Sequence, residues 1–182
     1  AAADGDFDAV AEDVTATVYG LAVGLYDVCV SGTDIVGNTG LADCTLLAVY
    51  DPDAGFVTGG GWIDSPRDAY VADPSLTGKA NFGFVSKYKK GADIPTGHTE
   101  FQFQAAGLDF KSTDYQWLVV SGARAKFKGT GTIKHVEGSF GFMLTAIDGS
   151  ISGGGGADKF RIKIWDEADE TVIYDNEMGE SD

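Results

Sequence analysis

Histidine and cysteine are scarce in this sequence, with two of each among 182 residues. Zinc sites use Cys and His ligands at short spacings, and the cysteines do not form a CxxC pair, so no zinc site is expected. His98 and His135 lie in predicted turns, and neither is accompanied by a GxSxG nucleophile elbow or a reactive cysteine. A Ser–His–Asp arrangement is compatible with the spacing, but turn histidines are typical of solvent-exposed positions. The sequence therefore predicts a protein that is not an enzyme.

Long apolar segments are also missing. No run approaches the roughly 20 apolar residues that cross a bilayer, so membrane insertion is not expected. The first residues show neither the basic region nor the apolar core of a signal peptide. We expect that such a peptide has been removed or that the chain comes from a longer protein.

Basic side chains are absent from residues 1–53, which carry ten acidic ones. Residues 54–147 hold ten basic and eight acidic side chains, residues 148–182 hold three and ten, and the net charge is -15. Nucleic acid is not an expected partner, because phosphate binding requires basic patches. Acidic surfaces attract divalent cations and basic patches on neighbouring molecules, or simply keep a protein in solution.

No helical periodicity is visible, and apolar residues alternate with polar ones instead. The chain has 26 glycines, and turn signals such as GNTG, KKGAD and IDGS recur at short intervals. This pattern is typical of all-β sandwiches and barrels. The sequence predicts a first module over residues 1–53, a second over residues 54–176, and an acidic tail over residues 177–182.

The first module has the spacing of a tyrosine corner. Leu21, Gly24 and Tyr26 fit a motif in which a tyrosine at the start of a strand hydrogen-bonds back across a turn. The stretch DGDFDAVAEDVTATVYGLAVGLYDVCVSGTDIVGN resembles the later strands of bacterial immunoglobulin-like or fibronectin type III-like modules. The resemblance implies a partial Ig-like sandwich, since a complete one needs about seven strands and roughly 100 residues.

A partial sandwich leaves an apolar face and an unpaired edge in water, which is unfavourable for an isolated monomer. Three interpretations stay open. The chain is a fragment of a multidomain surface protein, the first module packs on the second, or another copy supplies the missing strands by donor-strand complementation.

Cys29 and Cys44 lie on consecutive predicted strands. An isolated cysteine pair in a β-rich, acidic chain indicates one structural disulfide and an oxidising, extracellular compartment. Two buried free thiols are the alternative.

The second module contains at least seven alternating runs, and in DKFRIKIWD the positions Phe160, Ile162 and Ile164 are expected to point inward. Its motifs GGGWI, FGFVSKYKKG and FRIKIWD resemble a C-terminal β-domain of large secreted bacterial proteins, found after Ig-like modules. We expect an antiparallel, jelly-roll-like β-sandwich. The resemblance implies an extracellular or cell-surface location and brings no established catalytic role.

Two glycine runs do not match the GxxxxGK[ST] phosphate loop. Residues 59–61 are expected to lie in a strand and to let Trp62 dock where two sheets meet. Residues 153–156 predict a mobile loop between strands, with a cation held by Asp148 and Asp158 as the alternative.

Calcium is the metal that the acidic residues favour, because hard cations take six to eight oxygen ligands. Asp4, Asp6 and Asp8 form a D-x-D-x-D run, but Ala9 and Thr15 occupy positions where an EF-hand loop has glycine and a bidentate acid. A second candidate calcium site lies at the junction of the modules and comprises Asp51 and Asp53, with Asp27, Asp34 and Asp43 nearby. A solvated acidic face is the alternative.

Basic side chains alternate on two predicted strands, one with Lys87 and Lys89, the other with Arg124, Lys126 and Lys128. If the strand faces adjoin, they form a basic assembly patch for the acidic first module of another copy, and such heterologous contacts generate filaments. Two ordinary solvated faces are the alternative.

The three tryptophans could provide stacking platforms for sugars. Trp165 continues the outward alternation of Lys159, Arg161 and Lys163 and is expected to be exposed, whereas Trp117 is expected in the core.

The sequence thus predicts an extracellular, non-catalytic structural module of a surface adhesin, stalk or filament. It would associate with other copies or with adjacent modules of the same protein, with calcium as a stiffening ion. A carbohydrate-binding accessory module of a larger secreted protein is the alternative.

Overall fold

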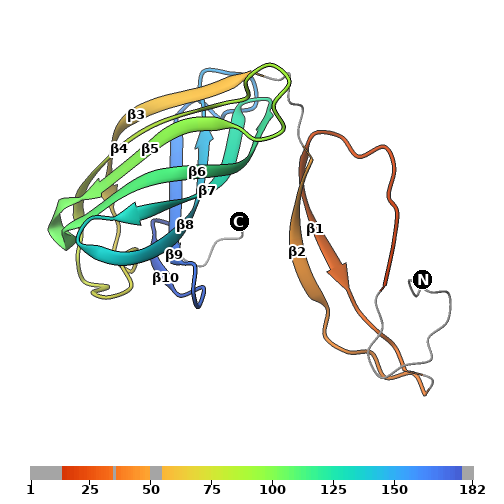
Figure 1. The fold of residues 1–182 in the computed structure, drawn as a ribbon. Coiled ribbons are helices and arrows are strands. Elements are labelled where there is room, and N and C mark those ends of the chain that lie inside the picture. The colour runs from red at the N-terminus through yellow and green to blue at the C-terminus, as the bar shows by residue number, and fades with distance from the viewer. Residues whose placement is uncertain (1–13, 35, 50–54, 178–182) are drawn as a thin grey trace.

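The computed structural model describes residues 14–34, 36–49 and 55–177 (Figure 1). The chain is all-β, as predicted, and the one helical element in these ranges is a 3₁₀ turn, Gln104–Ala106. The strands form two separate antiparallel sheets, one of two strands and one of eight. Within the same ranges, no helix is long and apolar enough to cross a membrane.

The small sheet is a hairpin of β1 (Gly24–Val30) and β2 (Asp43–Val49), with Cys29 directly opposite Cys44. The Tyr26 hydroxyl donates a 2.9 Å hydrogen bond to the Ala22 carbonyl oxygen, which confirms the predicted tyrosine corner. In the connecting turn, the Asp34 carboxylate accepts hydrogen bonds from the Asn38 side chain and backbone and from the Val36 backbone. These bonds, led by that from the Asn38 side chain, lower the pKa of Asp34.

The large sheet is a meander in which every strand pairs with its chain neighbours, so β3 and β10 form its edges. Its strands are β3 (Phe56–Ser65), β4 (Gly78–Lys87), β5 (Thr96–Phe103), β6 (Leu108–Ser121), β7 (Arg124–Ile133), β8 (Val136–Ile147), β9 (Lys159–Asp166) and β10 (Val172–Asp175). It curls into a half-barrel (Figure 1), where the sequence predicted a jelly-roll-like sandwich. Short turns such as residues 122–123 and 134–135 favour pairing between consecutive strands, and a jelly roll needs longer connections.

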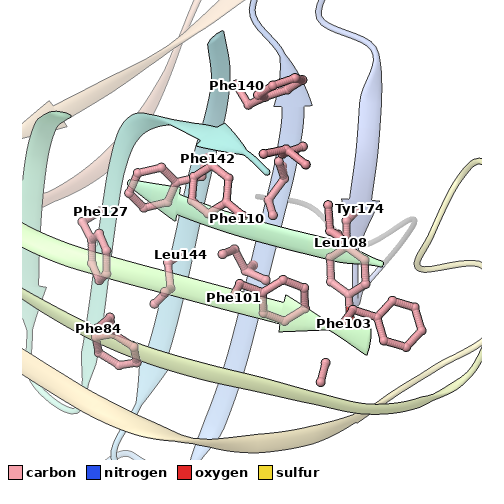
Figure 2. Packing of buried hydrophobic residues seen from close by; sticks show 14 of the residues in the cluster. Phe84, Phe101, Phe103, Leu108, Phe110, Phe127, Phe140, Phe142, Leu144 and Tyr174 are labelled. Atoms are coloured by element: carbon pink, nitrogen blue, oxygen red, sulfur yellow. The ribbon is translucent and has the colours of Figure 1, made fainter. Parts of the chain in front are cut away.

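The concave face of the curled sheet holds an aromatic core (Figure 2). Phe101, Phe110 and Phe142 have no exposed surface. Phe82 of β4 and Phe160 of β9 stack across the interior with ring centroids 3.7 Å apart. The predicted inward alternation of Phe160, Ile162 and Ile164 is confirmed, because all three belong to this core or pack against it.

The connection between β3 and β4 closes one end of the half-barrel against β10. The Val71 amide donates to the Ile173 carbonyl at 3.1 Å, and the Asp175 amide donates to the Ala69 carbonyl at 2.8 Å. Inside, the Tyr174 hydroxyl donates to Ser65 Oγ at 2.9 Å, and burial raises the pKa of Tyr174 to about 12. The two sheet edges are thus joined at this end.

A buried ion pair and one amide side chain hold the C-terminal end of the chain to β9. Arg161 donates to both carboxylate oxygens of Asp175, at 2.9 and 2.8 Å, and the two side chains are 10% and 4% exposed. Beyond the last pair of the short β10, the Asn176 side chain accepts from the Ile162 amide and donates to the Phe160 carbonyl. Asn176 therefore substitutes for a strand partner.

Residues 59–61 lie within β3, as predicted, but the expected docking of Trp62 between two sheets is wrong. Trp62 points away from the interior and is 57% exposed. The glycines serve the core instead. A Cβ at Gly59 would approach the Phe84 ring to 2.6 Å, and Gly61 faces the Phe82 ring.

Removing the Asp175 carboxylate should destabilise the large sheet, because the buried Arg161 guanidinium loses its two charge-assisted hydrogen bonds to Asp175. We expect Asp175→Ala to lower the free energy of unfolding by about 3 kcal/mol, measured by urea denaturation. Glu137→Ala, at an exposed position of β8, is the matched control. Equal effects of the two substitutions would contradict a stabilising role for the ion pair.

Candidate functional site

A cleft of about 660 Å³ opens where β3 and β9 begin, at the end opposite the Tyr174 closure. Glycines 59–61 and the rings of Phe82, Phe84 and Phe160 line it, and Arg124, Asp148, Asp158 and Lys159 lie at its rim. Fixed ligand orientation needs convergent polar groups. The two rim carboxylates instead bind their own loop, Asp148 through Ser150 and Asp158 through the Gly149 amide. The cleft alone does not identify a ligand.

The loop that these hydrogen bonds hold contains the glycine-rich residues 153–156. The loop between β8 and β9 is confirmed, and the Gly154 and Gly156 amides donate to the Ile151 and Gly149 carbonyls within it. Among the described residues, no three His, Cys, Asp or Glu side chains gather into a metal-binding group. Asp148 and Asp158 therefore organise the loop.

The predicted calcium ligands Asp4, Asp6, Asp8, Asp51 and Asp53 lie outside the described residues. Of the nearby acids, Asp34 is engaged in its own turn, and Asp27 and Asp43 lie on β1 and β2. Calcium binding stays a prediction.

The predicted disulfide between Cys29 and Cys44 is confirmed and links β1 to β2 across the hairpin, with Cα atoms 4.0 Å apart. The register places the cysteines on one face of the hairpin. The other face, which we call the hairpin face, carries the apolar residues Tyr26, Val28, Val30, Leu47 and Val49, with Thr45 and Asp43 directly opposite Val28 and Val30. Val28, Val30 and Leu47 are 41%, 51% and 41% exposed. A largely apolar strand, β1, is thus left open to solvent on this face.

The hairpin approaches the large sheet at β6, where Cα atoms of the two parts come within 8 Å. On the outer face there, opposite the aromatic core, Val119 and its partner Lys126 are 4% and 6% exposed. This approach leaves the hairpin face partly uncovered, because Val28, Val30 and Leu47 are exposed while Tyr26 and Val49 are half-buried.

The predicted assembly patch does not form as a continuous exposed surface. Lys87, Lys89 and Arg124 are exposed, but Lys126 is buried. Lys128 is half-buried, with its ammonium over the Trp165 ring at 5.4 Å. The two strands are also separated, because β5 and β6 lie between β4 and β7. Alternation correctly placed these side chains outward but could not show what covers them.

Trp165 points outward, as predicted, but is only half-exposed, because its ring lies directly over Gly141 of β8. The expectation that Trp117 is in the core is wrong, since it lies on the outer face opposite Lys128. The most exposed tryptophan is Trp62, which the sequence analysis expected to dock between two sheets. The alternation of FVTGGGWIDS contained the signal, because Val57 and Ile63 pack inward and Trp62 falls on the opposite face.

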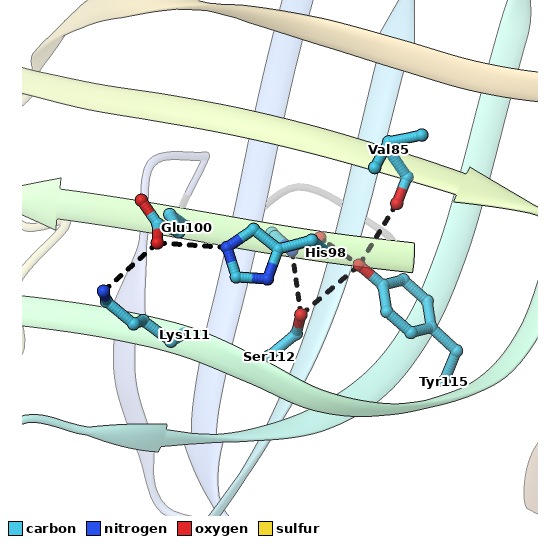
Figure 3. Close-up of polar contacts among 7 residues, drawn as sticks. Val85, His98, Glu100, Lys111, Ser112 and Tyr115 are labelled. Atoms are coloured by element: carbon cyan, nitrogen blue, oxygen red, sulfur yellow. Dashed lines mark hydrogen bonds and ion pairs between the residues drawn. The ribbon is translucent and has the colours of Figure 1, made fainter. Parts of the chain in front are cut away.

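His98 lies within β5, which corrects its assignment to a turn, and His135 lies in the β7–β8 turn, as predicted. His98 Nε2 and Lys111 Nζ contact Glu100 Oε1 at 3.0 and 3.2 Å (Figure 3). Hydrogen bonds from His98 and then Lys111 lower the pKa of Glu100. This cluster on the outer face holds the Glu100 carboxylate between an imidazole and an ammonium group.

The Tyr115 hydroxyl lies on the inner side of the same strands. It shares a 2.7 Å hydrogen bond with Thr99 Oγ1 and lies 3.4 Å from Ser112 Oγ and from the Val85 carbonyl oxygen (Figure 3). Burial raises the pKa of Tyr115, so the phenol stays protonated. The network bridges β4, β5 and β6 and is structural in character.

Comparison of the chain with protein-family models, with curated proteins and with solved structures finds no match. The resemblance to bacterial surface modules therefore stays a prediction.

Loss of the disulfide should affect the hairpin alone. Closing a loop of this length stabilises by about 3 kcal/mol, and a two-stranded sheet has little else to hold it. In the double variant Cys29→Ala/Cys44→Ala, we expect the β1 and β2 amides to move to random-coil positions in ¹⁵N–¹H spectra. The β3–β10 amides should keep their positions. A hairpin that stays dispersed would show that other contacts hold it.

Proposed function

We propose that the chain is an extracellular, non-catalytic structural module that associates with other copies of itself through the hairpin face. The observation that carries this proposal is the two-stranded sheet whose apolar side remains open, with Val30 51% exposed. Isolated two-stranded sheets are marginally stable in water and gain stability when an apolar face is covered. The hairpin therefore favours a partner.

In this proposal the hairpin belongs to one sheet of a partial Ig-like sandwich, and the second sheet is what would cover its apolar face. The tyrosine corner at Tyr26 and the alternation of Tyr26, Val28 and Val30 are typical of an Ig-like strand whose inner face meets a second sheet. In our proposal, strands of another copy supply that second sheet. This arrangement is a form of strand complementation.

The disulfide supports the proposed extracellular location, and the charge distribution bears on contacts between copies. Structural disulfides persist in oxidising compartments, which supports an extracellular site. Residues 1–53 carry acids and no Lys or Arg, whereas Lys87, Lys89 and Arg124 are exposed on the large sheet. These exposed basic side chains are local positive charges on a large sheet that is acidic overall, and pairs of opposite charge across a contact between copies would help to fix its orientation.

Sedimentation over a concentration series tests the proposal. The wild-type chain should form dimers or larger species, and Val28→Lys should weaken association by about tenfold or more, because it places a charge in an apolar contact. The control is Asp27→Lys, one residue away on the same strand and on the opposite face.

Two outcomes would contradict self-association through the hairpin face. One is a wild-type chain that stays monomeric over the whole concentration range. The other is an equal effect of the Val28 and Asp27 substitutions, since only Val28 belongs to that face.

A further inference from the structure

Four side chains form a row across neighbouring strands on the outer face of the large sheet. Trp62 of β3 pairs with Asn81 of β4, Asn81 with Gln102 of β5, and Gln102 with Asp109 of β6. Each is flanked in its strand by residues that face the core, so all four point outward. With strands about 4.8 Å apart, the row is about 14 Å long.

Trp62 gives the row an aromatic end. Its side chain is 57% exposed on the edge strand, the largest exposure among the tryptophans. The Lys79 ammonium lies 5.2 Å from the centroid of the ring and helps to hold its orientation. An indole with this much free surface offers a flat apolar platform.

The rest of the row has unused hydrogen-bonding capacity. Asn81 and Gln102 are half-buried, and their side-chain amides form no hydrogen bond with any described residue. One Asp109 carboxylate oxygen is buried without a partner. An unmade hydrogen bond costs free energy, so this carboxylate has an unused acceptor.

The surface beside the row is flat and unobstructed. Gly60 and Gly83 are paired on the same outer face, and a Cβ built at Gly83 would meet nothing within 4 Å. We call this pair of glycines the glycine floor. Glu100, which contacts His98 and Lys111, lies beside it on β5. A ligand lying on the row would therefore meet backbone below it and polar groups at its sides.

These features together specify the chemistry of a ligand. Amide groups both donate and accept, and a carboxylate only accepts, so the ligand must offer hydroxyl groups that do both. The indole requires an apolar face on the same ligand. An anion is disfavoured by Asp109 and Glu100, and a purely apolar ligand would leave the amides unpaired. A neutral sugar combines hydroxyls with an apolar ring face.

We infer that Trp62, Asn81, Gln102 and Asp109 form a binding row for a neutral oligosaccharide on the outer face of β3–β6. This function goes beyond self-association and uses a different surface from the hairpin face. It also moves sugar stacking from Trp165, whose ring packs over Gly141, to Trp62.

Affinity electrophoresis tests the row with defined probes. The chain is run through native gels that contain xylan, mixed-linkage β-glucan, galactomannan or glycol chitin, with a pectin gel as the acidic comparison. We expect at least one neutral polysaccharide to retard the wild-type chain. Trp62→Ala should weaken the apparent affinity by about tenfold or more, as expected for loss of a stacking contact.

Gly83→Val provides a second, independent variant. The added side chain occupies the open glycine floor and leaves Trp62 and both amides in place, so it should abolish retardation while the fold and the sedimentation behaviour stay unchanged. Trp165→Ala should be retarded like the wild type. The proposal is overturned if no neutral polysaccharide retards the chain, or if only pectin does. It is also overturned if Trp62→Ala and Gly83→Val are retarded like the wild type.

Discussion

Phe82 on β4 and Phe160 on β9 stack across the interior of the large sheet, although the two strands are five positions apart in its order. The stack holds the meander in its curl and brings the flanking rings of Phe84 and Phe101 around Phe160. Glycine is required at position 59, because a Cβ there would approach the Phe84 ring to 2.6 Å, whereas a Cβ at Gly61 would make only an ordinary 3.5 Å contact with Phe82. Closure at the other end by Tyr174 and Ser65 depends on the same curl. The outer face is left free, and β3 becomes an edge strand that presents Trp62.

Among the side chains that the structure describes, the hairpin has no comparable set of buried residues. A disulfide, a tyrosine corner and an Asp34 turn hold two strands together, but none of these buries apolar surface. The hairpin face keeps about the same exposure at Val28 and Leu47, 41% each. The two parts of the chain therefore differ in how far they bury their apolar side chains. The large sheet buries its own aromatic core, whereas Val28, Val30 and Leu47 of the hairpin remain exposed, and our proposal assigns their cover to a partner.

Period-two alternation predicted the strands and their faces well, because side chains on a strand point alternately to two sides. Phe160, Ile162 and Ile164 were placed inward, and Trp165 outward, on this basis alone. The cysteine pair and the Tyr26 spacing also predicted specific bonds. Alternation could not predict the number of sheets, because it does not show whether consecutive strands pair within one sheet or cross to another.

Alternation also cannot show which outward positions a neighbour covers. Lys126 is buried and Trp165 is half-covered through its contact over Gly141, while Trp62, with Gly60 two residues before it on the same face, stays open. The sequence therefore did not predict that Trp62 is more exposed than Trp165. The row from Trp62 to Asp109 depends on the register of four strands that are far apart in sequence, and no local pattern contains that register.

Hydrogen–deuterium exchange of the wild-type chain at low and high protein concentration tests the central claim most directly. We predict that amides of β3–β10 are protected at both concentrations, because their sheet is complete without a partner. Amides of β1 and β2 should exchange rapidly at low concentration and become protected at high concentration. Hairpin amides that exchange as slowly as those of the large sheet at both concentrations would contradict the claim that the hairpin needs a partner.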